Sequence, residues 1–180
     1  MFKKILLTTI LSATTGIALA NPAPYIGASL GINVNSSNNN AAFGSFRGMP
    51  AKVFAGYGGV INQNVYLAGE LTGTIATGEI SNAGPLKTTY GYSASIIPGV
   101  MLSDHTLAYA RAGVAYSRFS KLNTMKSGGE FGLGMQTSLT QNVDLRGEYD
   151  FTAYRHVNYA GTSTAPRSDA FNLGLVYKFD

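Results

Sequence analysis

Apolar and polar residues alternate along the chain from residue 25 onward, and the alternation recurs in eight separate runs. In the third run, for example, Leu67 and Leu71 belong to one face, whereas Glu70 and Thr72 belong to the other. A period of two over about ten residues is typical of a strand in a membrane-spanning β-barrel. The eight predicted strands cover residues 25–34, 52–58, 65–75, 89–96, 108–117, 130–139, 143–152 and 170–179.

The connections between these runs alternate between short and long. Three are tight and polar, at residues 62–64, 103–105 and 140–142, and four are longer, at residues 35–49, 77–86, 120–128 and 155–168. This interleaving places both chain ends on the side of the short turns. Outer-membrane barrels have the same asymmetry, with short periplasmic turns and long external loops. The sequence therefore predicts an all-β fold, an eight-stranded up-and-down antiparallel transmembrane β-barrel.

One residue conflicts with the pattern. Pro98 continues the fourth run but cannot donate a hydrogen bond to a neighbouring strand, and a closed barrel has no free edge on which to place it. We therefore expect a bulge at Pro98, or a fourth strand that ends before it.

Alternation alone does not decide whether the apolar face meets lipid or the core of a soluble barrel or sandwich, which is the alternative fold. Three features favour lipid. Gly, Ser and Ala crowd the polar face, as the narrow interior of an eight-stranded barrel requires. Aromatic residues of the apolar face gather toward the strand ends, like two interfacial girdles. The charges at strand centres all lie on the polar face, and they are Lys52, Glu70, Arg111, Glu130, Arg146, Glu148 and Asp150.

The first twenty residues differ from the rest. Lys3 and Lys4 precede a mostly apolar stretch that ends in the small-x-small sequence Ala18-Leu19-Ala20. This layout predicts a cleaved secretory signal peptide at residues 1–20 and an outer-membrane β-barrel domain at residues 21–180. Cleavage would remove two of the 13 basic residues, leaving 11 against 9 acidic residues and a net charge of +2. Without a concentrated basic stripe, a nucleic-acid partner is not expected.

Candidate enzyme chemistry is sparse. The chain has no cysteine, which excludes disulfides, thiolate metal sites and cysteine nucleophiles. His105 falls in a predicted tight turn, and His156 falls at the start of the last long loop. Neither lies in a pattern that supports a nucleophile, a metal site or a nucleotide-binding loop, so we expect no cofactor and no enzyme activity. A lipid-modifying barrel enzyme is a distant third hypothesis.

The polar face of the predicted strands carries a charge cluster. Glu70, Arg111, Arg146 and Glu148 each lie three to six residues beyond a short turn, so they should reach comparable heights inside the barrel. The charges assigned to the interior are nearly balanced, with Lys52, Arg111, Arg146 and Lys178 against Glu70, Glu130, Asp144, Glu148 and Asp150. We interpret them as mutually paired and as closing the lumen. A narrow gated pore for small solutes is the alternative.

The C-terminal sequence carries the most specific motif. Asn172, Gly174, Tyr177 and Phe179 form a polar residue, a glycine and two aromatic residues at alternate positions. This pattern looks like the assembly signal on the last strand of outer-membrane barrels, although such strands usually end on the aromatic residue and here Asp180 follows.

With two further patterns, Tyr25-x-Gly27-x-x-x-Gly31 and Tyr109-x-Arg111-x-Gly113, the chain resembles the eight-stranded surface proteins of the opacity and outer-membrane-protein-A-like group. The resemblance covers nearly all of residues 21–180. It implies localisation in the outer membrane of a Gram-negative cell, contact with outer-membrane lipid, and delivery by periplasmic chaperones and the barrel-assembly machinery. It also implies a structural and surface-interaction role, in which loops around residues 36–40 and 158–166 meet a host or surface ligand.

Overall fold

The computed structural model describes residues 20–37, 44–82, 84, 86–120, 124–159 and 162–179. The predicted signal peptide, apart from its last residue Ala20, lies outside these ranges. Ten strands are present: β1 (Ala20–Ser36), β2 (Phe46–Asn62), β3 (Val65–Asn82), β4 (Thr88–Ser103), β5 (Thr106–Phe119), β6 (Thr124–Ser138), β7 (Val143–Tyr154), β8 (Val157–Tyr159), β9 (Thr162–Thr164) and β10 (Arg167–Lys178). The described residues contain no helix that is long and apolar enough to cross a membrane.

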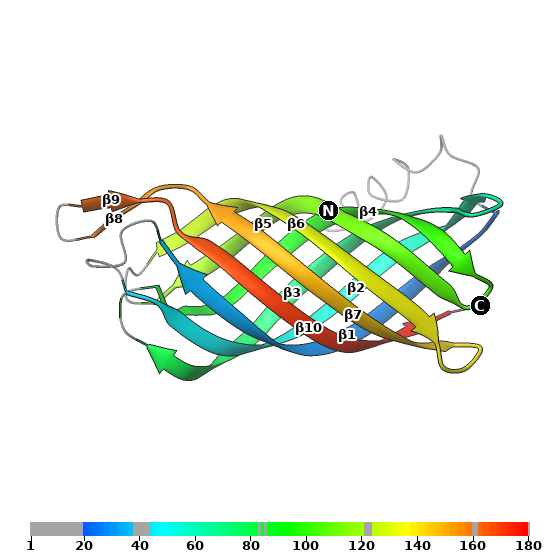
Figure 1. Ribbon diagram of the computed structural model, residues 1–180, viewed down its shortest axis with the longest axis horizontal. Helices are drawn as coiled ribbons and strands as arrows, with labels where there is room; N and C mark the ends of the chain where they lie inside the picture. Colours follow the sequence, from blue (N-terminus) through cyan, green and yellow to red (C-terminus); the bar gives the residue numbers. More distant parts are fainter. Residues whose placement is uncertain are drawn as a thin grey trace, which may run out of the picture.

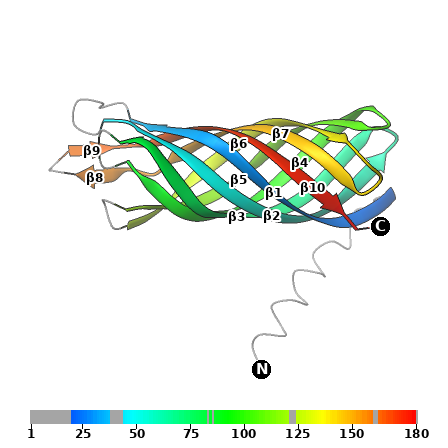
Figure 2. The ribbon, with the colours of Figure 1, turned by 90° about the horizontal axis from the view of Figure 1, so that it is seen from below.

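Eight of the strands close into one barrel. Each pairs antiparallel with its neighbours in the chain, and β1 pairs with β10 to complete the circle, in the order β1-β10-β7-β6-β5-β4-β3-β2. Figures 1 and 2 show the strands tilted around a long cylinder, with the C-terminus at the end opposite to β8 and β9. The prediction of an eight-stranded up-and-down barrel is confirmed. Below, the end that carries β8 and β9 is called the loop side, and the other end is called the turn side.

The strands are longer than the alternation predicts. β1 and β2 have 17 residues each and β3 has 18, because all three continue into segments that were assigned to long loops. Backbone pairing continues past the apolar band, because the hydrogen bonds between two antiparallel strands do not require apolar side chains. The last predicted loop likewise contains a small hairpin formed by β8 and β9.

The expectation for Pro98 is wrong. Pro98 lies inside β4 and pairs with Leu67 of β3 without a shift of register. On the other side, the β4–β5 pairing skips Ile97 and Pro98 and resumes at Gly99 in the same register. The barrel therefore accommodates the missing N–H by omitting one step of the ladder on the β5 side, with neither a bulge at Pro98 nor an early strand end.

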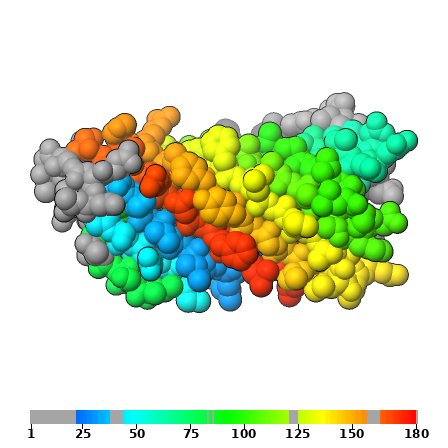
Figure 3. Space-filling view, viewed as in Figure 1, coloured from blue at the N-terminus to red at the C-terminus, as the bar shows by residue number. Residues whose placement is uncertain are grey.

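The apolar face of the strands points outward. Leu71, Leu133 and Phe171 are 59–67% exposed, whereas the intervening residues of the same strands are largely buried in the lumen. In Figure 3 the strands β10, β7 and β6 run diagonally across one face of this outer surface. The hydrophobic effect therefore does not bury this face within the chain, and the outer surface needs an apolar surrounding.

Candidate functional site in the barrel lumen

The four charged residues predicted to converge in the lumen lie within ion-pair distance of one another. Arg111 Nη2 is 2.5 Å from Glu70 Oε1 and 3.0 Å from Glu148 Oε2. Arg146 Nη1 is 2.6 Å from Glu70 Oε2. All four residues are buried, with exposures between 3% and 7%. Because they come from β3, β5 and β7, which are not neighbours in the barrel, these ion pairs join its opposite walls.

The guanidinium group of Arg146 is surrounded by aromatic rings. It lies 4.6 Å from the ring centroid of Phe54 and 5.4 Å from those of Tyr25 and Tyr109. Its Nε donates a hydrogen bond to Gln136 Oε1 at 2.9 Å. The rings add cation–π attraction to the ion pair with Glu70, and this attraction is strongest where the cation is removed from water.

Two tyrosines complete the coordination of the carboxylates. The Tyr25 hydroxyl donates to Glu70 Oε2 at 2.9 Å, and the Tyr109 hydroxyl donates to Glu148 Oε2 at 2.7 Å. Buried charges are tolerated when their hydrogen-bonding capacity is satisfied in this way. We call these seven residues, Glu70, Arg111, Arg146, Glu148, Tyr25, Phe54 and Tyr109, the charge–aromatic cluster.

Glycines on neighbouring strands make room for these rings. Tyr25 pairs across the ladder with Gly56, and Tyr109 pairs with Gly134. A Cβ atom on Gly56 would lie 2.3 Å from the Tyr25 side chain, and one on Gly134 would lie 2.3 Å from the Tyr109 side chain. The sequence assigned these glycines correctly to the interior, but it gave no indication that each one faces an aromatic ring.

Little space remains inside the charge–aromatic cluster. The cavity lined by Phe54, Arg111, Arg146 and Glu148 measures about 10 Å³. That volume holds one water molecule at most. This level of the lumen is therefore tightly packed.

The remaining interior charges lie above and below the cluster. Toward the turn side, Lys178 Nζ is 3.1 Å from Asp144 Oδ1. Toward the loop side, Lys52 Nζ is 2.9 Å from Asp150 Oδ2. The carboxylate of Glu130 accepts a hydrogen bond from Ser95 Oγ at 3.0 Å. Of the interior carboxylates in the described part of the chain, Glu130 is the one for which no ion pair within 4 Å is seen.

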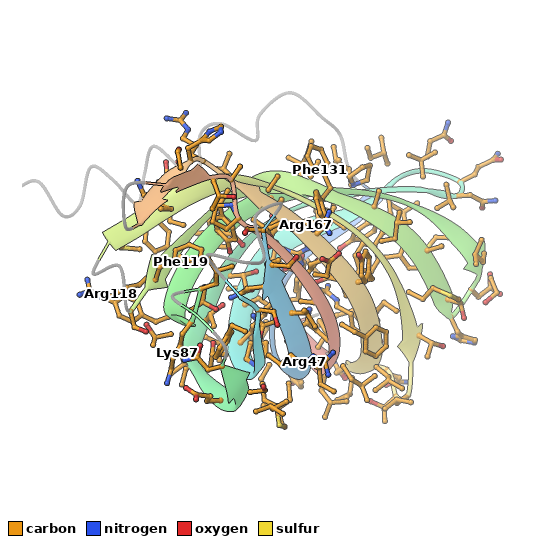
Figure 4. The ribbon with its side chains drawn as sticks, turned by 60° about the vertical axis from the view of Figure 1, so that its left-hand side comes forward. Arg47, Lys87, Arg118, Phe119, Phe131 and Arg167 are labelled. Carbon is orange, nitrogen blue, oxygen red and sulfur yellow. The ribbon has the colours of Figure 1, made fainter. Side chains whose placement is uncertain are left out.

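A buried apolar cluster at the loop-side end of the lumen was not predicted from the sequence. Phe46, Leu86 and Phe119 are fully buried and pack with Tyr154 at the loop-side mouth. The rings of Phe119 and Tyr154 meet edge to face, with centroids 5.1 Å apart. In Figure 4 Phe119 lies within this mouth, whereas the preceding residue, Arg118, lies at its outer rim. We call these four residues the apolar lid.

The alternation of apolar and polar residues did not predict the apolar lid, because its four residues lie outside the alternating runs. Phe46 and Leu86 fall in segments predicted to be loops. Phe119 offered a signal, since it continues the inward register of the fifth run two residues beyond Ser117. An aromatic residue on the inward side of a strand end indicates that the mouth is covered.

The C-terminal motif occupies both faces of β10. Asn172 is buried in the lumen, where its Nδ2 donates to Asp150 Oδ2 at 2.9 Å. Gly174 lies against the backbone of β1, because a Cβ atom at this position would lie only 2.6 Å from Ala28 O. Tyr177 and Phe179 point outward near the turn side, 45% and 42% exposed, and their rings meet edge to face. Their position fits an aromatic girdle.

The two histidines do not belong to the charge–aromatic cluster. His105 is exposed in the tight turn between β4 and β5, and His156 is exposed between β7 and β8. Within the described residues, no group of three or more His, Cys, Asp or Glu side chains could hold a metal ion.

Comparison with known proteins gives one family match and several structural matches. The family model for the outer membrane protein beta-barrel domain matches residues 5–179. The 25 kDa outer-membrane immunogenic protein of Brucella melitensis is 30% identical over 106 residues, which cover 53% of this chain and 46% of that relative. The alignment thus spans less than half of the Brucella protein.

Two solved outer-membrane proteins share the fold. Neisserial surface protein A (NspA) superposes with a TM-score of 0.59 at 20% identity, over 89% of this chain and 100% of NspA. Ail, the attachment invasion locus protein of Yersinia pestis, superposes with a TM-score of 0.55 at 14% identity, over 89% of this chain and 100% of Ail. Ail has also been solved in complex with the heparin analogue sucrose octasulfate. None of these names describes an enzyme.

Proposed function

Because the chain belongs to the outer membrane protein β-barrel domain family and lies in the outer membrane, we propose that it is a closed structural anchor whose loops interact with ligands outside the cell. The double closure of the lumen carries this proposal. The charge–aromatic cluster fills one level of the lumen, and the apolar lid covers the loop-side mouth. A solute on a straight path would have to displace both.

Bilayer conductance tests the closed lumen against the alternative, a narrow gated pore. The purified protein in planar bilayers should give no steady single-channel currents, because two desolvated layers block the ions. Phe119→Ala should open the apolar lid but leave the current at baseline, since the charge–aromatic cluster still blocks the lumen. Large, steady, salt-proportional currents from the unaltered protein would replace this proposal with the pore.

The charges at the loop side support an anionic ligand. Outside the lumen, the described residues near this end carry six basic side chains against two acidic ones, an excess of four, namely Arg47, Lys87, Arg118, Lys126, Arg155 and Arg167 against Glu79 and Asp169. Figure 4 shows Arg47, Lys87, Arg118 and Arg167 around the mouth. Around the turn-side tip, Asp104 is the only exposed charged side chain in the described part of the chain. By analogy with Ail and its heparin analogue, we propose a sulfated or phosphorylated glycan as the ligand.

Sucrose octasulfate is a suitable probe for this ligand class. The protein in lipid nanodiscs should bind it, and replacing Arg47, Arg118 and Arg167 together by Gln should weaken binding at least about tenfold, because long-range attraction to a polyanion depends on clustered charge. Asp104→Asn changes the charge at the opposite end and serves as the control. Equal binding by the triple variant and the unaltered protein would refute a rim-binding ligand.

The C-terminal strand supports a second interaction, during biogenesis. We expect Asn172, Gly174, Tyr177 and Phe179 to be read by the barrel-assembly machinery after delivery by periplasmic chaperones. Tyr177→Ala with Phe179→Ala should leave protein in the periplasm and lower the amount in the outer membrane. Tyr57→Ala alters an outward aromatic residue of β2 and is the control, because a loss common to both would point to the girdle alone.

Export is expected to precede this step. The predicted cleavage after Ala20 makes Asn21 the mature N-terminus, and N-terminal sequencing of protein extracted from the outer membrane tests it. An N-terminus at Met1 would contradict the predicted signal peptide and its boundary with the barrel domain.

A further inference from the structure

The loop-side half of the lumen holds a polar chamber between the charge–aromatic cluster and the apolar lid. This cavity measures about 60 Å³, which is enough for several water molecules or one small solute. Threonine and serine are the most frequent residues in its walls, which also include Lys52, Glu130 and Asp150. Two outward-facing residues, Tyr90 and Tyr92, also line it, although their side chains are 46% and 56% exposed on the outside of the barrel. The chamber therefore borders the segment of β4 that carries these tyrosines.

The wall is incomplete at that place. The ladder between β3 and β4 ends at Thr74 and Gly91, although β3 continues to Asn82. The β2–β3 ladder, by contrast, reaches Asn82, and the β4–β5 ladder reaches Thr88 and Phe119, whereas the β6–β7 ladder stops at Gly128, four residues short of the start of β6. Beyond Thr74, the β3–β4 seam is thus left to side-chain contacts.

Two such contacts bridge the open seam. Thr77 Oγ1 donates a hydrogen bond to the carbonyl oxygen of Thr89 at 3.2 Å, and Lys87 Nζ lies 2.7 Å from Glu79 Oε2. The lysine and glutamate side chains are 29% and 42% exposed, so water competes for this ion pair. Exposed pairs of this kind contribute little stability and open readily. They form a weak latch on a lateral opening.

The chamber has unsatisfied negative character. Lys52 is compensated by Asp150, whereas the buried carboxylate of Glu130 has only the hydroxyl of Ser95 as a hydrogen-bond partner. Asp150 Oδ1 accepts no hydrogen bond and has only Arg111 Nε nearby, at 3.7 Å. Asn33 Oδ1 is also without a hydrogen bond, and both residues are more than nine-tenths buried and line the chamber. The Arg118 guanidinium group lies over the Tyr90 ring, 5.9 Å from its centroid.

From this arrangement we infer that the chamber is a binding site for a small cation of the primary-ammonium class, which enters laterally through the β3–β4 seam. An ammonium group supplies N–H donors for Asn33 Oδ1, Asp150 Oδ1 and the Glu130 carboxylate, and its charge offsets that of Glu130. The hydroxyls of the wall replace part of its water shell. The site ends at the charge–aromatic cluster, so it binds without conducting across the membrane.

The absence of cysteine allows a direct test by single-cysteine labelling. Ser93→Cys places a thiol in the chamber, and His105→Cys places one on the exposed turn as the reference. Aminoethyl and sulfonatoethyl methanethiosulfonate are cationic and anionic thiol reagents. After normalisation to His105→Cys, the cationic reagent should label the chamber thiol at least about tenfold faster, as expected for one carboxylate at short range.

Three variants in the Ser93→Cys background separate the parts of the inference. Glu130→Gln should abolish the charge preference. A charge-neutral removal of the latch, Glu79→Gln with Lys87→Gln, should speed labelling several-fold. Phe119→Ala tests whether solutes enter through the mouth instead.

Competition identifies the ligand class. Methylammonium chloride should slow labelling of the chamber thiol, whereas tetrapropylammonium chloride at equal concentration should not, because it exceeds the cavity volume. Equal labelling by both reagents, a preference that survives Glu130→Gln, or no protection by methylammonium would overturn the cation site. A rate unchanged by removal of the latch would overturn the lateral route, whatever the result for Phe119→Ala.

Discussion

The two halves of the lumen are built from the same strands but differ in the size and charge of the side chains that point into them. In the turn-side half, the rings, guanidinium groups and carboxylates of the charge–aromatic cluster leave about 10 Å³ of space at their own level, and a wider cavity of about 370 Å³ follows toward the turns. The loop-side half is lined by short hydroxyl side chains and leaves about 60 Å³ under the apolar lid. The charge–aromatic cluster is therefore a tightly packed layer, whereas the loop-side half is an open space bounded by hydroxyl groups.

This difference indicates which interior residues stabilise the barrel and which tolerate substitution. Ion pairs in the charge–aromatic cluster join β3, β5 and β7 across the barrel, so each partner depends on the others. In the loop-side half, the polar groups meet a cavity and each hydroxyl can exchange one partner for water. Substitutions should therefore be costly in the first half and inexpensive in the second.

The largest expected effect is that of Arg111→Ala. Its removal leaves Glu70 and Glu148 without a shared cation, which costs about 3–5 kcal/mol for a buried pair, although access of water to the space should reduce this figure. Urea unfolding in lipid vesicles measures the change. Arg118→Ala removes the same side chain from the outer rim and should cost far less. Equal losses for the two variants would contradict the central role of the lumen pairs.

An outward substitution sharpens the comparison, because the lipid-facing surface is alike over both halves. Leu71 is 61% exposed on the outer face, next to the inward Glu70 and Thr72. Leu71→Arg should destabilise the barrel by about 2–4 kcal/mol if the position faces the bilayer midplane. Leu71→Ala is the control for lost apolar contact. If Leu71→Arg lowered the free energy of unfolding no more than Leu71→Ala, this would contradict contact of Leu71 with lipid.

A smaller effect is expected where an interior glycine faces a ring. Gly134→Ala would press a methyl group against Tyr109 and should cost about 1–3 kcal/mol, as overpacking does in tightly filled cores. Gly147→Ala is a matched control in β7, since a Cβ there meets nothing within 4 Å. The same unfolding assay applies, and similar stability of the two variants would show that the turn-side half is looser than its contacts indicate.

The smallest effect should come from the loop-side chamber. Thr74→Ala removes a hydroxyl that faces the cavity, and its cost should stay within about 0.5 kcal/mol, as for other replaceable polar contacts. Thr72→Ala, one step closer to the charge–aromatic cluster, should cost more, because its hydroxyl lies 3.3 Å from Glu70 Oε1 and 3.5 Å from Arg111 Nη1. A reversed order would place the boundary between the two halves elsewhere.

The sequence alone predicts the eight strands of the barrel, their order along the chain and the face on which their residues lie, but not the β8–β9 hairpin. The period of two is a local property, since a strand sends successive side chains to opposite faces whatever surrounds it. The same reasoning placed Glu70, Arg111, Arg146 and Glu148 on the inward face at similar heights. The ends of the strands could not be predicted as well, because β3, for example, continues to Asn82 after its apolar alternation has ended.

Only the tertiary structure decided which inward residues meet. The contact of Tyr25 with Gly56 depends on register, and the position of Arg146 among three rings depends on closure of the barrel. The apolar lid and the early end of the β3–β4 ladder likewise join residues that are far apart in sequence. Local alternation does not predict these cross-strand contacts, because a one-residue change in register or a different closure of the barrel would pair the same strands in another way.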